Sequence, residues 1–186
     1  AQGEDGEENS ALSLGINPGN GGGFAGTGSN GPADVVDISG STYMAFYFNP
    51  NTFAASNEPL ILEVNLQEDT NGDGNFDNAV DDEFQTLYTV TPGAGWNLVA
   101  IPLASFTDDN TAGVGADDGF DFTKLATVVF AIGGLQGPEF NIQFDDILFW
   151  ENLVSIDATL DVVFDDFTGL NGDGNPENAF AFSGGA

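Results

Sequence analysis

The chain contains no cysteine and no histidine, and only one of its 186 residues, Lys124, is positively charged. Without cysteine and histidine it has no thiol nucleophile, no imidazole base near neutral pH and none of the usual ligands for zinc or haem. Because phosphate binding needs cations, the lack of Lys and Arg excludes nucleic acid and anionic membranes as partners. No apolar run has the length needed for membrane insertion.

The acidic residues number 30, which gives a formal charge of −29. Charge of this size repels itself, so a compact fold needs counter-ions, either bound divalent cations or a salty medium. We therefore expect an extracellular protein at a cell surface, with Ala1-Gln2 following a removed signal peptide. The absence of disulfides does not forbid secretion.

Runs of alternating apolar and polar residues predict strands. In the clearest run, 60–67, Glu63, Asn65 and Gln67 face outward and the apolar residues between them face inward. Met44, Phe46 and Phe48 likewise share one face of a strand over 43–48. Further strands are predicted at 84–91, 96–103, 125–132, 140–150, 158–167 and 179–182.

No window has a helical period, so the sequence predicts an all-β fold, an antiparallel β-sandwich of the jelly-roll type with extended N- and C-terminal arms. The predicted division is a polar, Gly-rich N-terminal arm over 1–33, the β-sandwich over 34–156, and a C-terminal donor-type strand and loop over 157–186.

Three segments carry a family resemblance: Trp96–Leu103 followed by Phe106, then Leu125–Phe130, and Ile142–Ile147 with the sequence I-Q-F-D-D-I. On these segments the stretch 42–150 resembles the jelly-roll carbohydrate-binding-module superfamily of the galactose-binding-like type. The resemblance implies the fold more than the function, because relatives of this superfamily bind different partners.

Modules of this superfamily usually open on a strand of the form V-x-F-D-D-F, but here that sequence occurs at Val162–Phe167, after the expected end of the fold near Trp150. The C-terminal segment would then fold back onto its own domain, begin a truncated second domain, or complete the sheet of the next subunit. We favour the third alternative, because an open sandwich with an unpaired edge strand invites such pairing. A head-to-tail contact of this kind need not close, and it then produces filaments. The residues that we expect to mediate assembly are Val162, Phe164, Phe167, Phe180 and Phe182.

The segment 69–77, with the sequence D-T-N-G-D-G-N-F-D, places oxygen ligands at alternate positions and Gly at the sixth, as in the first half of an EF-hand calcium loop. Val80 stands where an EF-hand has its final Glu, so Asp81, Asp82 or Glu83 would take that bidentate role. The alternative is a solvated turn between two strands. The expected Ca²⁺ ligands are Asp69, Asn71, Asp73, Asn75, Asp77, Asp81 and Asp82.

A second copy of this motif follows at 171–179, in which Gly169 replaces the first ligand. It predicts a weaker site, completed by another segment or subunit. Its expected ligands are Asn171, Asp173, Asn175 and Glu177.

The acidic pairs Asp145-Asp146 and Asp165-Asp166 do not predict an enzyme, because neighbours on a strand point to opposite faces. Tyr43 and Tyr47 share a face and are the expected platform for a glycan, whereas Trp96 and Trp150 are expected to be packed.

The sequence thus predicts a structural subunit of a calcium-stabilised extracellular filament or tubule, whose partners are copies of itself and which assembles by strand donation. The alternative is a secreted, calcium-dependent carbohydrate-binding module with polysaccharide as its partner.

Overall fold

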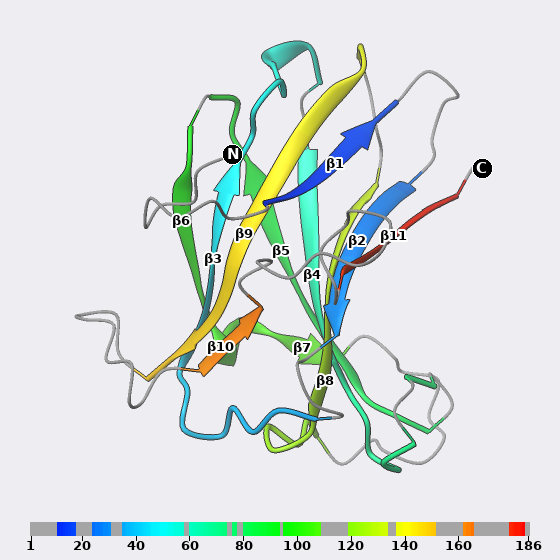
Figure 1. Cartoon of the computed structure of the whole chain (residues 1–186), viewed down its shortest axis with the longest axis vertical. Coiled ribbons are helices and arrows are strands. Elements are labelled where there is room, and N and C mark those ends of the chain that lie inside the picture. Colours follow the sequence, from blue (N-terminus) through cyan, green and yellow to red (C-terminus); the bar gives the residue numbers. More distant parts are fainter. Residues whose placement is uncertain are drawn as a thin grey trace.

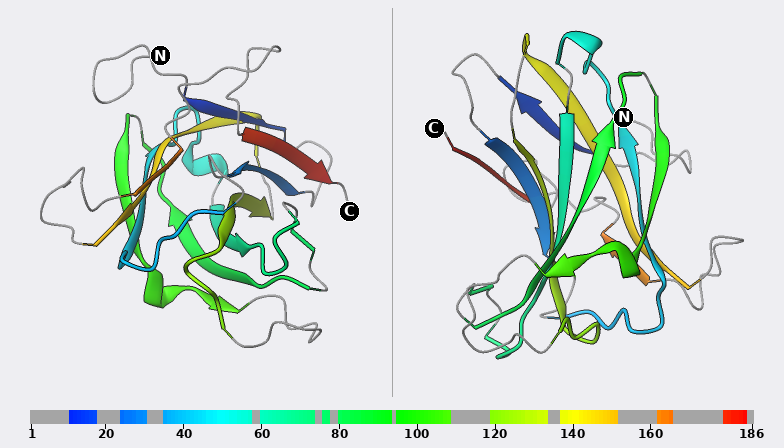
Figure 2. Two further views of the ribbon diagram at one scale, coloured as in Figure 1. Left: turned by 60° about the horizontal axis from the view of Figure 1, so that its bottom comes forward. Right: turned by 180° about the vertical axis from the view of Figure 1, so that it is seen from behind.

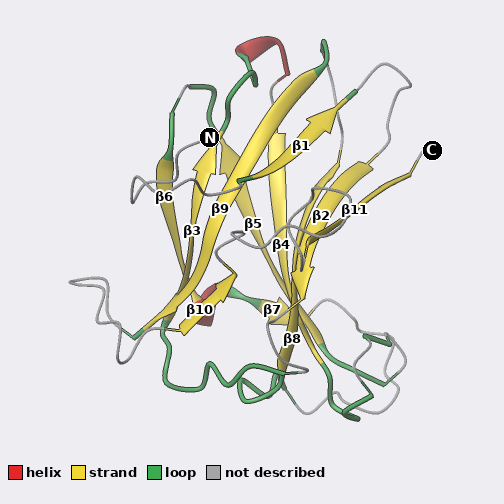
Figure 3. Cartoon of the chain, viewed as in Figure 1, coloured by secondary structure: helices red, strands yellow, loops and turns green. Residues whose placement is uncertain are grey.

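The computed structural model describes residues 11–17, 24–30, 35–57, 60–73, 76–77, 80–93, 95–108, 119–133, 137–151, 162–165 and 179–184. These residues form two antiparallel sheets that pack face to face, with two short 3-10 turns, η2 (Ala55–Asn57) and η3 (Leu103–Ser105) (Figures 1 and 3). The predicted all-β sandwich is confirmed. In this described part, no helix has the length and apolar character that a membrane span needs.

The strands are β1 (Leu12–Ile16), β2 (Phe24–Asn30), β3 (Tyr43–Asn49), β4 (Leu60–Glu68), β5 (Glu83–Val90), β6 (Asn97–Pro102), β7 (Thr107–Asp108), β8 (Leu125–Gly133), β9 (Phe140–Trp150), β10 (Val162–Asp165) and β11 (Ala179–Gly184). One sheet has the order β1-β9-β3-β6, and β10 also pairs with β9. The other sheet has the order β11-β2-β8-β4-β5-β7. Figure 2 shows the two layers from two further sides.

The core lies between the sheets and is rich in phenylalanine. The rings of Phe130 and Phe144 stack with their centroids 4.4 Å apart, and Phe46 meets Phe130 edge-on at 4.9 Å. These rings come from β8, β9 and β3, so they join the two sheets. Burial of one such side chain contributes about 1.5–3 kcal/mol, and the aromatic contacts add to it.

A β-bulge in β9 changes which residues face the core. Asp146 has a φ of +46°, and the pairing with β3 shifts between Ala45 and Tyr47. After this extra residue Phe149 faces the main core, while Trp150 packs with Ala45 in a smaller buried cluster on the outer side of the sheet. Trp150 is buried as predicted, but it lies on the opposite face of the sheet from Phe144, because the bulge interrupts the simple alternation of side chains.

Strands also form in the segment that the sequence assigned to a polar arm. β1 pairs with the first half of β9, and its residues Leu14 and Ile16 are buried in the core. β2 pairs with β8 and contributes Ala25 to the core. β2 has the sequence F-A-G-T-G-S-N, whose small residues give no alternation of apolar and polar side chains. The alternation criterion therefore did not predict it.

Candidate functional site

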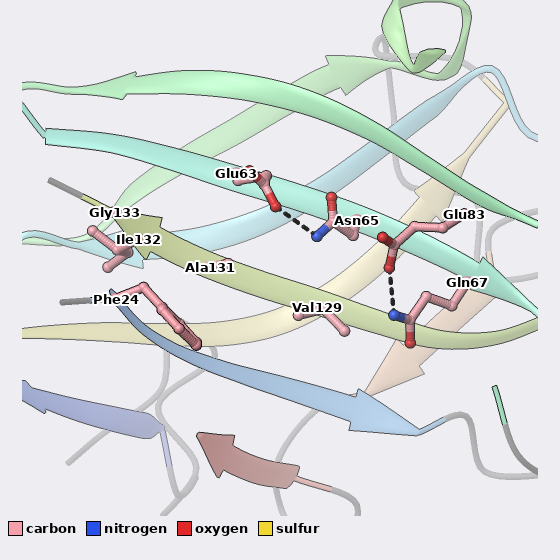
Figure 4. Close-up of a pocket in the computed structure, with 9 residues that line it drawn as sticks. All are labelled: Phe24, Glu63, Asn65, Gln67, Glu83, Val129, Ala131, Ile132 and Gly133. Atoms are coloured by element: carbon pink, nitrogen blue, oxygen red, sulfur yellow. Dashed lines mark hydrogen bonds between the residues drawn. The ribbon is translucent and has the colours of Figure 1, made fainter. Parts of the chain in front are cut away.

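A groove of about 430 Å³ lies over the outer face of the sheet that contains β4 and β8 (Figure 4). Leu62, Val64 and Leu66 of β4 are fully buried in the core, so the residues between them lie on the opposite face of the strand. The residues that line the groove are Phe24, Glu63, Asn65, Gln67, Glu83, Val129, Ala131, Ile132 and Gly133.

Two amide–carboxylate pairs run along this groove. Asn65 Nδ2 donates to Glu63 Oε1 at 3.0 Å, and Gln67 Nε2 donates to Glu83 Oε2 across the β4–β5 pair. An ionised carboxylate only accepts hydrogen bonds, so each pair fixes which end of the amide is nitrogen. The amide oxygens are thereby directed away from the carboxylates.

Asn65 has an acceptor that the described residues do not satisfy. The side chain is 5% exposed, and its Oδ1 is buried without a hydrogen-bond partner among them. A buried polar atom of this kind costs about 1–3 kcal/mol. Asn65 lines the groove, so a ligand that displaces the side chains covering this oxygen and donates a hydrogen bond to it would offset the cost.

Apolar surface lies beside the polar row. Phe24, at the start of β2, is 47% exposed and lines the groove (Figure 4). Leu87 of β5 is opposite Glu63 in the strand register, so it lies on the same face, and it is 64% exposed. An exposed ring next to amides and carboxylates presents both stacking and hydrogen-bonding groups to a ligand.

The predicted calcium loop begins with a turn that Asp69 organises. Asp69 is buried, and its Oδ1 accepts hydrogen bonds from the N–H groups of Gly72 at 2.7 Å and Asp73 at 3.2 Å. Asn71 Oδ1 accepts from the same Asp73 N–H at 2.8 Å. Gly72 has a φ of +73°, a conformation that glycine adopts without strain.

Asp81 connects the two ends of this loop. It is 1% exposed, and its Oδ1 accepts from Thr70 N at 3.0 Å while its Oδ2 accepts from Asp77 N at 2.8 Å. Its backbone N–H donates to Asp77 O, also at 2.8 Å. Asp82, the next residue, is buried as well.

Glu68 attaches the neighbouring segment 119–124 to the same region. Its Oε2 accepts from Asp121 N at 2.6 Å, and its Oε1 accepts from the Thr70 hydroxyl at 2.5 Å. Burial raises the pKa of Glu68 above its ordinary value, against the effect of these two hydrogen bonds. Lys124 Nζ donates to Thr70 O at 3.2 Å and lies 3.8 Å from Asp121 Oδ2, so the single cation of the chain is at this loop.

The donor set of this loop consists of oxygen atoms alone, which suits Ca²⁺. In the described residues, however, no three acidic side chains converge as a metal site would require. The carboxylates of Asp69 and Asp81 instead accept backbone N–H groups. Asn75 lies outside the described residues, and calcium binding stays a prediction.

Similar folds are known among solved structures. One is a family 11 carbohydrate-binding module from Clostridium thermocellum in complex with a β-1,3-1,4-mixed-linked tetrasaccharide, with 18% identity, a TM-score of 0.48, and coverage of 80% of this chain and 86% of that chain. Another is the family 11 carbohydrate-binding module of the cellulosomal cellulase Lic26A-Cel5E of Clostridium thermocellum, with 17% identity, a TM-score of 0.44, and coverage of 74% and 81%. No protein-family model and no curated protein matches the chain.

The tyrosines predicted as a glycan platform lie away from this groove. Tyr43 and Tyr47 belong to β3, in the other sheet, and both are half-buried. Tyr43 packs against the small cluster that contains Trp150, so part of its ring is already covered. Trp96, predicted to be packed, is partly buried.

The C-terminal residues predicted to mediate assembly lie in strands that pair within the chain. Val162 and Phe164 belong to β10, which pairs with β9, and Phe180 and Phe182 belong to β11, which pairs with β2. This is the pairing that the fold-back alternative predicts. Phe167 lies outside the described residues, as do the predicted ligands of the second calcium loop, Asn171, Asp173, Asn175 and Glu177.

The sequence predicted part of the groove. It placed Glu63, Asn65 and Gln67 on an outer face, which the structure confirms. It gave no sign that Glu83 lies opposite Gln67, because that contact depends on the register of β4 and β5. Phe24 was missed because its strand was not predicted.

Proposed function

We propose that this chain is a non-catalytic carbohydrate-binding β-sandwich that acts outside the cell, at a cell surface. Its ligand is a segment of polysaccharide that lies in the groove over β4 and β8. The observation that carries the proposal is one groove that contains two amide–carboxylate pairs, the buried, unpartnered Oδ1 of Asn65 and, two strands away on β2, the exposed ring of Phe24. Sugars present hydroxyl donors at their edges and C–H groups on their faces, so different units of one polysaccharide chain would meet the two groups.

Calcium has a supporting role in this proposal. The loop over 69–82 directly follows β4, the strand that supplies Glu63, Asn65 and Gln67. A cation bound there would offset the charge of the buried carboxylates of Asp69 and Asp81. It would thereby hold the end of β4 in place without contacting the ligand.

The test is binding to a panel of soluble polysaccharides, measured by affinity electrophoresis and calorimetry with calcium present. Phe24→Ala should weaken binding about tenfold, which corresponds to about 1.4 kcal/mol of stacking. Asn65→Leu should weaken binding similarly but should not lower the melting temperature, because it also removes a buried unsatisfied acceptor.

The matched control is Leu98→Ala. Leu98 is 45% exposed on β6, in the other sheet, so its truncation removes a similar exposed apolar side chain far from the groove. The proposal would be contradicted if Phe24→Ala and Leu98→Ala changed the affinity equally. It would also be contradicted if the protein bound no polysaccharide in the panel.

A second candidate function is self-assembly into a calcium-stabilised filament. It would use β10 and β11, which pair with β9 and β2 respectively within the chain. If these strands were exchanged between copies, the same backbone hydrogen bonds would link subunits head to tail. Electron microscopy with calcium and with a chelator tests this candidate, and monodisperse monomers in both conditions would refute it.

A further inference from the structure

We propose that the groove binds a glycan that carries amino groups, so that a sugar ammonium donates to its carboxylates and amide oxygens. This inference rests on the proposed carbohydrate binding and specifies the class of sugar.

The groove is rich in acceptors. Glu63 and Glu83 each orient an amide nitrogen toward themselves, so the amide oxygens of Asn65 and Gln67 are directed elsewhere. Asn65 Oδ1 is buried and has no donor among the described residues. The best complement to carboxylates and amide oxygens is a group with several N–H donors, such as an ammonium.

The groove also lacks positive charge. Its lining includes two carboxylates and no cation, and the single cation of the chain, Lys124, is held at Thr70 and Asp121. The formal charge of −29 would attract a cationic polymer and repel an anionic one. An acidic polysaccharide therefore meets repulsion at long range and no cation in the lining of the groove.

Phe24 fits the same ligand. Its exposed ring lies at the edge of the groove, where the ring face attracts a cation in addition to the C–H groups of a sugar (Figure 4). The groove thus combines a stacking surface with acceptors suited to an amine.

The experiment compares two β-1,4-linked hexamers by calorimetry at mildly acidic pH, one of glucosamine and one of glucose. The two differ in one group per ring. The glucosamine hexamer should bind at least about tenfold more tightly than the glucose hexamer, because one charge-assisted hydrogen bond contributes about that factor to the affinity. Spermine serves as a cation without a sugar ring and should bind more weakly than the glucosamine hexamer.

Two variants separate binding in the groove from general charge attraction. Glu63→Gln removes one charge, but the new amide oxygen still accepts a hydrogen bond from Asn65 and keeps that side chain oriented. The substitution should lower the affinity for the glucosamine hexamer about tenfold. Glu151→Gln removes the same charge from an exposed position outside the groove and should change little.

Equal binding of the two hexamers would overturn the inference and leave carbohydrate binding standing. Binding of neither hexamer, nor of any polysaccharide in the panel, would overturn both proposals. Spermine binding as tight as that of the hexamer, or an equal loss in Glu63→Gln and Glu151→Gln, would mean general charge attraction and would also overturn the inference.

Discussion

Asp81→Asn should destabilise the fold strongly, although it changes only one atom of the side chain. The carboxylate accepts from Thr70 N with one oxygen and from Asp77 N with the other, and it is buried. Asparagine keeps one acceptor but places an NH₂ group against the other N–H. One charge-assisted bond is then lost and the second becomes a bond to a neutral acceptor.

The magnitude follows from these two bonds. A hydrogen bond to a charged group contributes about 1.5–3 kcal/mol and a neutral one about 0.5–1.5 kcal/mol, so the total loss should be about 3 kcal/mol. In a domain of this size each kcal/mol shifts the melting temperature by about 2–4 °C, so Tm should fall by about 6–12 °C.

The assay is urea unfolding followed by fluorescence, with thermal melting in parallel and a chelator in both. Glu151→Gln is the control, because it removes the same charge from an exposed position. The midpoint should fall without a change in the slope with denaturant, since the surface exposed on unfolding stays the same. If Asp81→Asn lowered the free energy of unfolding no more than Glu151→Gln does, this prediction would be wrong.

Three further predictions concern calcium, pH and a tight turn. Calcium at a hundred times its Kd should add about 2.7 kcal/mol to the free energy of unfolding. Asp69→Asn should remove most of that gain. A melting temperature that does not change when calcium is added would contradict the calcium proposal. The raised pKa of Glu68 favours the protonated carboxyl in the folded state, so its stabilising contribution is complete below the ordinary pKa and is lost as pH rises through the raised one. The stability of the native protein relative to Glu68→Gln should therefore fall over that range, and a difference independent of pH would refute this. Gly137 has a φ of +80°, and a Cβ there would lie 2.4 Å from Ser56 O. The free energy of unfolding measured in urea should therefore be about 3 kcal/mol lower in Gly137→Ala. An unchanged midpoint would contradict this prediction and show that the turn relaxes.

The fold class and most of the strands follow from the amino-acid pattern. The predicted runs 43–48, 60–67, 84–91, 96–103, 125–132 and 140–150 correspond to β3, β4, β5, β6, β8 and β9 within a few residues. In these strands the alternation of side chains reports burial directly, because successive residues on a strand point to opposite faces. The turn at Asp69 was also recognisable, since Asn, Asp and Gly have strong local preferences.

The candidate site could not be predicted in full, because it forms only when strands distant in the sequence pair. The groove depends on which residue of β5 lies opposite Gln67, and no short turn fixes that register, because the long loop 69–82 joins the two strands. The position of Phe24 and the bulge at Asp146 could not be predicted from the sequence for a related reason. Small residues and an inserted residue both break the alternation, so only pairing with β8 and β3 shows where these side chains lie.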